Sequence, residues 1–178
     1  NSWLYYGCTE THACNYQSTS VENDGSCEYP NAGLDCNGSP LPDFPTLETH
    51  SIARLWNEAL LVAIRNDWAR PTVHARNLWH SSALMYDAWS AFSEPSTVSP
   101  QSWLLGDTVD GFSIPFSGVL EPESDSERLI ARRRALSFGM YRLLQHRFAL
   151  APHAQLISVH LHSQMESFGY DTAFVSMD

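Results

Sequence analysis

The sequence contains no lysine, and all ten of its basic residues are arginines. This absence excludes a Schiff-base lysine, a phosphate-loop lysine and any other catalytic lysine from these residues. Twenty acidic residues outnumber the arginines and give a net charge of -10 at pH 7. Nucleic acids and anionic membranes attract basic patches, so the composition predicts binding to neither.

Long apolar runs are also missing. No stretch of about eighteen apolar residues occurs, so we expect no membrane-spanning helix. The first residues, Asn-Ser-Trp-Leu-Tyr-Tyr, carry neither an initiator Met nor the pattern of a signal peptide. Because no terminating element is evident before Asp178 either, we expect an internal segment of a longer protein.

Hydrophobic residues make up 43% of the 178 positions, which is enough for one helical domain and a small appendage. We predict a mainly α fold, a helical bundle fragment preceded by a small, irregular module held together by disulfides. The predicted boundaries place the cysteine-containing module at 1–37, a proline-rich linker at 38–46 and the helical domain at 47–178.

All four cysteines, Cys8, Cys14, Cys27 and Cys36, lie in the first fifth of the chain, among many Asn, Asp, Gly, Ser and Thr residues. Such a segment buries too little apolar surface to fold without staples, so we expect two disulfides. Three pairings are open. A zinc site is the alternative, but the spacings lack paired Cys-x-x-Cys knuckles. Oxidised cysteines predict a secreted or cell-surface location.

The same segment carries three short motifs: Gly-Cys-Thr at 7–9, Ala-Cys-Asn-Tyr at 13–16 and Asn-Asp-Gly-Ser-Cys-Glu-Tyr at 23–29. Together they resemble a repeat found in secreted bacterial multidomain proteins, which serves there as a surface-protein spacer. Asn15, Asn23 and Asp24 offer oxygen atoms of the kind that calcium prefers, so calcium is a candidate ligand. A plain Asx-turn explains the same residues.

Two helices follow the linker. Thr46 and Thr49 are candidate N-caps of the first, which should end near Ala69 because Arg70 precedes a proline. Its predicted buried face consists of Ile52, Leu55, Trp56, Ala59, Leu60, Ala63, Ile64 and Trp68.

The second helix is predicted from Pro71 to about Phe92, with the proline in the first turn. Its large apolar residues fall on one wide arc, which we expect to be buried within the bundle. This arc comprises Ala75, Leu78, Trp79, Met85, Tyr86, Trp89 and Phe92. Arg76, His80 and Asp87 form a narrow strip elsewhere on the helix, either as a structural ion-pair and hydrogen-bond strip or with a role at a site.

Segments 56–61, 63–65, 70–78 and 85–89, together with His80, resemble the N-terminal helices of vanadium-dependent haloperoxidase-like proteins, within the type 2 phosphatidic acid phosphatase superfamily. The resemblance implies a helical bundle whose vanadate, or phosphate in the phosphatases, is held by Lys-x6-Arg-Pro, Pro-Ser-Gly-His and Arg-x5-His segments. We expect none of these here: Ala63 stands seven positions before Arg70, and Pro-Ser-Gly-His does not occur. An oxyanion of high charge needs several converging cations. We therefore expect no catalytic residue in this segment and a vanadate site downstream of Asp178.

Residues 95–122 should form a structured excursion with two short strands, including extended pieces at 103–106 and 111–116, where Phe112, Ile114 and Phe116 alternate. Ser124 to Glu127 is a capping box for a third helix, and a last helix runs from Pro152 to about Phe168, closed by Gly169. We interpret the basic run 132–134 as solvated or paired charge. The spacing of His153, His160 and His162 does not favour a metal site.

Three functions remain open at this point. The chain is the scaffold of a secreted haloperoxidase-like protein, part of a secreted acid phosphatase of the same superfamily, or a non-enzymatic surface or adhesion protein that reuses the scaffold. In each of them, its main partner is the remainder of its own chain.

Overall fold

The computed structural model describes residues 5–41, 46–93, 103–106, 108–109, 111–113 and 122–174. Within these ranges the chain forms four α-helices and four two-residue strands, so the predicted mainly α class is confirmed. The elements are, in chain order, β1 (Tyr6–Gly7), β2 (Glu22–Asn23), α1 (Ile52–Arg65), α2 (Pro71–Ser90), β3 (Thr108–Val109), β4 (Phe112–Ser113), α3 (Asp125–Arg147) and α4 (Ala154–Ser167).

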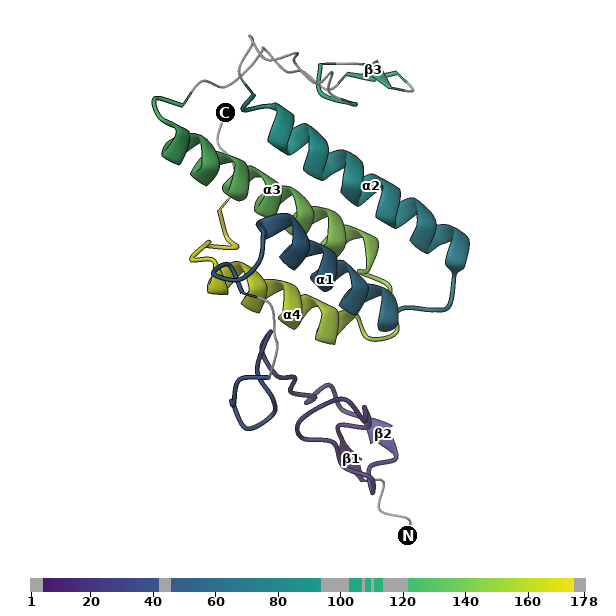
Figure 1. Ribbon diagram of the computed structural model, residues 1–178. Coiled ribbons are helices and arrows are strands. Elements are labelled where there is room, and N and C mark those ends of the chain that lie inside the picture. The colour runs from purple at the N-terminus through teal and green to yellow at the C-terminus, as the bar shows by residue number, and fades with distance from the viewer. Residues whose placement is uncertain are drawn as a thin grey trace.

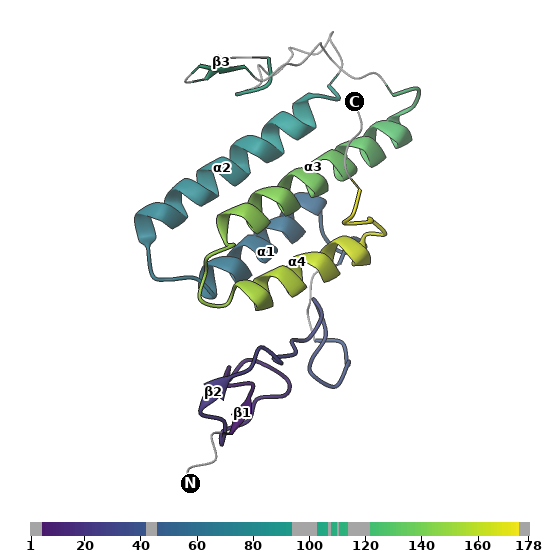
Figure 2. The ribbon, with the colours of Figure 1, turned by 180° about the vertical axis from the view of Figure 1, so that it is seen from behind.

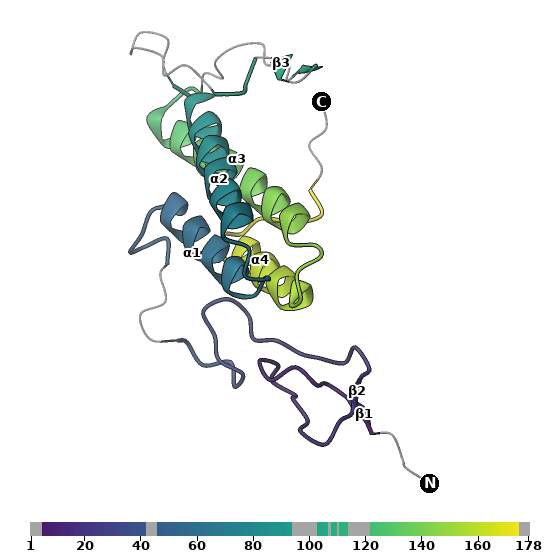
Figure 3. The ribbon, with the colours of Figure 1, turned by 90° about the vertical axis from the view of Figure 1, so that its right-hand side faces the viewer.

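The four helices form a bundle in which α1 and α3 each contact all the others. Helices α2 and α4 lie on opposite sides of this central pair (Figures 1 and 2). The cysteine-containing module lies below the bundle, beside α4 (Figure 3). No helix in the described ranges has the length and hydropathy needed to cross a bilayer.

Helix α1 starts later and ends earlier than predicted. Its N-cap is Ser51, whose hydroxyl accepts the backbone N–H of Arg54 at 3.3 Å, and its C-cap is Asn66. Thr46 and Thr49 bond to each other in the preceding turn instead of capping the helix. Trp68, predicted to be buried, lies beyond the helix and is 61% exposed. The Ser51 hydroxyl, two residues closer to the apolar run than Thr49, accepts an orphan amide of the first turn that the threonines do not reach.

The core is built from α1, α3 and α4. At its centre Trp56 is fully buried and donates its indole N–H to the hydroxyl of Ser137 on α3 at 3.0 Å. The predicted buried positions of α1 are confirmed at Ile52, Leu55, Trp56, Ala59, Leu60 and Ala63. From the other two helices the core takes Leu136, Phe138, Met140, Leu144, Ile157, Leu161 and Met165.

Helix α3 begins as the capping box predicts, because the Ser124 hydroxyl accepts the backbone N–H of Glu127 at 3.2 Å. Arg132 from the basic run is paired: its guanidinium donates to the carbonyls of Trp89 and Phe92 at the end of α2. A cation at this position also satisfies orphan carbonyls and opposes the helix dipole there. The interpretation of this run as paired charge holds for Arg132.

Helix α4 ends as predicted. Gly169 has a φ of 76°, and the backbone N–H of Tyr170 returns to the carbonyl of Met165 at 3.0 Å. Only a residue without a Cβ adopts this left-handed conformation at little cost, which is why the helix closes there.

The N-terminal module contains two disulfides, Cys8–Cys27 and Cys14–Cys36, and no free cysteine. The prediction of two disulfides is therefore confirmed, the pairing is resolved and the zinc alternative is ruled out. Strands β1 and β2 pair in parallel, and Ala13 joins the two buried sulfurs of Cys8 and Cys27 in a small core.

The segment between α2 and α3 contains the predicted pair of short strands, since β3 and β4 form an antiparallel ladder. Residues 103–106, predicted to be extended, form bends and a turn instead. Gly106 has a φ of 87°, which permits this turn. Phe112, Ile114 and Phe116 were predicted to alternate, and the side chain of Phe112 and both other residues lie outside the described part of the chain.

Candidate functional site

The predicted strip of α2 does lie on one side of the helix, and that side turns toward α3. Asp87 is buried at 5% exposure, and His80 contacts Arg147 on α3. Arg76 stays exposed, but it is near enough to act electrostatically on His80. The structure therefore brings His80 and Asp87 into contacts with other elements and leaves Arg76 at the edge.

Asp87 fixes the segment that follows α2. Its Oδ1 accepts the backbone N–H of Trp103 at 2.6 Å, and its Oδ2 accepts that of Leu104 at 2.9 Å. Hydrogen bonds to a charged acceptor are roughly twice as strong as neutral ones. A buried carboxylate with both oxygens satisfied in this way holds residues 103–106 against the helix, which is a structural role.

His80 and Arg147 form a polar pair across the α2–α3 interface, with 2.7 Å between His80 Nδ1 and Arg147 Nη2. A guanidinium only donates, so the imidazole must accept at Nδ1 and carry its proton on Nε2. Burial lowers the pKa of His80, and the positive charges of Arg147 and Arg76 lower it further. The ring is consequently neutral at pH 7.

A pocket of about 270 Å³ opens beside this pair. His80 and Arg147 supply its polar groups, and Ala83, Leu84, Leu104 and Leu143 supply the rest of its lining. Leu104 reaches this position because Asp87 holds its backbone. The pocket is therefore assembled by α2, α3 and the 103–106 segment together.

The opposite side of α2 exposes most of the apolar arc that we predicted to be buried, whereas Met85 and Phe92 of that arc are half-buried. Leu78, Trp79, Tyr86 and Trp89 are 44%, 52%, 38% and 41% exposed. The residues that α2 buries are instead small or polar: Asn77, Ser81, Ala83, Asp87 and Ser90. Gly139 on α3 lets Leu84 of α2 approach closely, because a Cβ on Gly139 would lie only 2.8 Å from Leu84 Cδ2.

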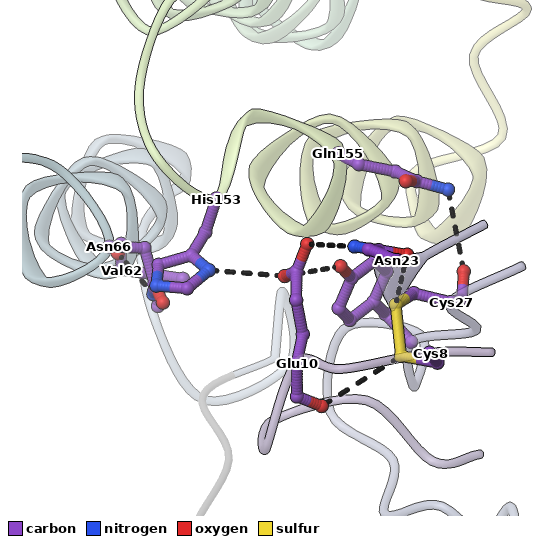
Figure 4. A network of polar contacts seen from close by, with 9 residues as sticks. Cys8, Glu10, Asn23, Cys27, Val62, Asn66, His153 and Gln155 are labelled. Carbon is purple, nitrogen blue, oxygen red and sulfur yellow. Dashed lines mark hydrogen bonds and ion pairs between the residues drawn. A yellow bond between two sulfur atoms is a disulfide. The ribbon is translucent and has the colours of Figure 1, made fainter. Parts of the chain in front are cut away.

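A second polar cluster joins the N-terminal module to the bundle (Figure 4). Glu10 Oε2 lies 3.1 Å from His153 Nδ1, just before α4, and accepts the hydroxyl proton of Tyr29 at 2.6 Å. Burial raises the pKa of Glu10, but these two hydrogen bonds and the neighbouring His12 outweigh it, so the pKa is lowered. Burial and the bond to Glu10 both raise the pKa of Tyr29. The cluster is therefore built around an ionised carboxylate.

The calcium candidates already have backbone partners. Asn23 Oδ1 accepts the N–H of Gly25 at 3.0 Å, and Asp24 Oδ1 accepts that of Ser26 at 2.9 Å. Asn15 bridges the same turn, accepting from Glu28 N–H and donating to the carbonyl of Ser26. These contacts are those of Asx-turns, and calcium binding stays a prediction.

The three histidines near α4 have separate surroundings. His153 pairs with Glu10, His162 bonds to the hydroxyl of Tyr141 at 2.9 Å, and His160 lines a cavity next to the module. Among the described residues no three His, Cys, Asp or Glu side chains are placed to hold a metal ion.

Comparison with known proteins gives no assignment. Neither a family model, nor a curated protein, nor a solved structure matches this chain. The function must therefore be argued from the residues themselves.

Arg147 is the residue that reading the sequence missed, because its partner His80 lies 67 positions away. One signal was present: Arg147 and His153 have the Arg-x5-His spacing of the third family segment, so the expectation that none of the three occurs was wrong on this point. The structure does not join the two side chains, since one contacts His80 and the other Glu10.

Proposed function

We propose that this chain is the N-terminal helical scaffold of a secreted vanadium-dependent haloperoxidase-like protein, and that the exposed face of α2 receives another helix of the same protein. The observation that carries this proposal is the exposed apolar face itself. The family resemblance of the α1 and α2 sequences supports the family part of it.

The exposed positions of α2 have the spacing of a helix-packing seam. Ala75, Trp79, Ser82, Tyr86 and Trp89 are all exposed and follow each other at intervals of four, three, four and three. This alternation is the one with which a helix presents a continuous stripe to a partner helix. Between residues 77 and 90 no exposed position of α2 is charged, whereas a solvated helix face normally carries charge. A helix is therefore the partner that fits the face best.

The described residues do not fit vanadate. Within the described part of the chain, Arg147 and Arg76 are the only cations that act on His80, the ring itself is neutral, and Arg76 remains exposed. A tetrahedral oxyanion with several charges needs more converging donors than this. We therefore assign the vanadate chemistry to another part of the parent protein and derive no step of it here.

Secretion is part of the proposal as well. Two disulfides in one short module fit an oxidising compartment and a surface-protein spacer. A module of this kind would act as a spacer between the helical domain and the cell surface or the neighbouring domain of the parent protein.

Tryptophan-specific ¹⁹F NMR tests the docking of α2. In residues 1–178 alone, 5-fluorotryptophan at positions 79 and 89 should respond to a soluble paramagnetic quencher, since both side chains are exposed. In the full-length gene product both resonances should be protected, while the exposed Trp68 serves as the reference. Equal quenching of Trp79 and Trp89 in the two proteins would show that no part of the parent protein covers α2.

Activity assays test the family assignment. Residues 1–178 with vanadate, peroxide and bromide should show no turnover, and turnover by this segment would refute the placement of the vanadate site. The full-length protein should oxidise bromide in a vanadate-dependent reaction. Hydrolysis of phosphomonoesters instead would identify an acid phosphatase, and neither activity would indicate a non-enzymatic surface protein.

A further inference from the structure

Arg147 is a cation that has no counter-ion among the described residues. Its side chain is half-buried, its Nε is closed to solvent and bonds to nothing in the described part of the chain, and its one contact there is neutral His80. Exposed Arg76, the second cation near His80, likewise has no carboxylate partner among these residues. Partly buried charges are normally paired, because removal from water costs free energy that a partner must offset.

The polar groups of the pocket beside Arg147 offer hydrogen-bond donors only. The guanidinium has no acceptor, and the bond to Arg147 occupies the imidazole lone pair on Nδ1, which leaves the Nε2 proton of His80. A group that bonds to both residues must accept from each of them. A carboxylate meets this requirement, and it also supplies the missing negative charge.

The other residues that line the pocket determine the chemical character of the ligand beyond its carboxylate. Ala83, Leu84, Leu104 and Leu143 are all apolar, so whatever follows the carboxylate should be apolar as well. The volume of about 270 Å³ lies just below the roughly 300–1,000 Å³ of drug-sized sites. The pocket therefore has room for a short chain or a single ring.

We propose that this pocket binds a small organic monocarboxylate with a short apolar tail, its carboxylate on Arg147 and His80 and its tail on Leu84, Leu104 and Leu143. Inorganic phosphate is a poorer fit because it lacks the tail and carries more charge than one guanidinium neutralises. This proposal does not depend on the family assignment or on what covers α2.

Isothermal titration calorimetry of the whole chain with hexanoate tests the proposal. We expect one site per chain with a dissociation constant of about 1 mM or tighter. Hexanol keeps the tail without the charge, and acetate keeps the charge without the tail; each should bind at least tenfold more weakly. Absence of hexanoate binding, or phosphate binding as tightly as hexanoate, would overturn the proposal.

Variants locate the site. Arg147→Gln should weaken hexanoate binding at least tenfold, and Arg147→Lys should weaken it less, because it keeps the charge but loses the planar fork. Leu143→Ala should weaken hexanoate more than acetate. Arg65→Gln, a change at an exposed arginine at the end of α1, is the matched control and should leave binding unchanged.

NMR of the Arg147 Nε–H keeps the test independent of variant folding. In the unsubstituted protein this resonance should shift on addition of hexanoate and remain unmoved by hexanol. Binding that leaves the Arg147 resonance in place would put the ligand elsewhere and refute the site.

Discussion

Trp56 shows how a single side chain can serve both packing and polarity. It is fully buried between the helices, and its indole N–H has an acceptor only because Ser137, also fully buried, lies opposite it. Neither residue satisfies its polar group alone, so each one explains the presence of the other.

Trp56→Phe should destabilise the chain by about 2–4 kcal/mol, because it leaves a cavity and strips the buried Ser137 hydroxyl of its partner. Urea unfolding followed by circular dichroism measures the loss. Trp68→Phe makes the same change at a side chain that is 61% exposed and should stay within about 0.5 kcal/mol of the parent. Similar losses in the two variants would contradict the placement of Trp56 at the centre of the core.

His160 gives the protein a pH dependence. Burial lowers its pKa to about 4, below its ordinary value of 6.5. The folded state therefore prefers the neutral ring. The contribution of His160 to the free energy of unfolding is complete above pH 6.5 and is lost as the pH falls toward 4. The full difference amounts to roughly 3 kcal/mol at about 1.4 kcal/mol per pH unit.

His160→Leu should flatten the plot of unfolding free energy against pH between 6.5 and 4. His146→Leu, at an exposed position of α3, should keep the slope of the parent. Denaturant titrations at several pH values give both slopes. An unchanged slope in His160→Leu would mean that this ring does not resist protonation in the fold.

At the scale of elements, α2 is the instructive case. Its apolar arc is wide, and hydrophobic periodicity alone turns such an arc inward. The helix turns the other way: the side that faces α3 buries Asp87 with small and polar residues, and Leu84 packs closely over Gly139, where a Cβ would collide. Periodicity ranks the faces of a helix by hydrophobicity; it does not include the shape of the neighbour that one of them must meet.

Sequence signals, in contrast, are sufficient to predict the features that depend on interactions between neighbouring residues. The cap at Ser124, the closing Gly169 and the buried positions of α1 each depend on a few neighbouring residues, and the sequence predicts them. The contact between His80 and Arg147 joins residues far apart in the chain. The choice among the three disulfide pairings likewise depends on distant residues. No spacing rule reaches that distance, so only the folded structure brings the residues of the candidate site together.

Asp87→Asn tests the link between α2 and the segment after it. The amide keeps one acceptor oxygen and gains a donor, so one of the two backbone N–H groups of Trp103 and Leu104 loses its partner. Hydrogen exchange at that amide should accelerate about tenfold or more, which corresponds to about 1.4 kcal/mol. Asp125→Asn, at a side chain that is 97% exposed, should leave both amides unchanged. Exchange in Asp87→Asn that matches the parent at both positions would refute the role of this carboxylate.

At the scale of the whole molecule, the question is what holds the module against the bundle. Three hydrogen bonds and one ring contact, between His12 and His153, do so in the described residues. The backbone N–H of Ala32 donates to Ser163 at 2.7 Å, Gln155 donates to the Cys27 carbonyl at 3.4 Å, and Glu10 meets His153. One disulfide fixes the Cys27 and Glu10 contacts relative to each other, because Cys27 is bonded to Cys8 and Cys8 stands two positions before Glu10. The module therefore docks as one unit and not as a loose tail.

Glu10 and His153 form the one contact between a carboxylate and a histidine at this junction in the described residues, and a double-mutant cycle measures its strength. With 22% and 32% side-chain exposure the pair is only partly screened, so Glu10→Gln and His153→Gln should show a coupling of about 1 kcal/mol at pH 6. The exposed pair Arg54–Glu58 on α1, cycled in the same way, should give about 0.3–0.5 kcal/mol.

Because the pKa of Glu10 is lowered in the folded state, the contribution of Glu10 to the free energy of unfolding is present above pH 4.5 and is lost as the pH falls through that lowered pKa. The coupling should therefore disappear in acid, and hydrogen exchange in the module should then rise while that of α1 stays constant. A coupling no larger than that of the α1 pair, or one that persists in acid, would mean that Ala32 and Gln155 hold the junction without it.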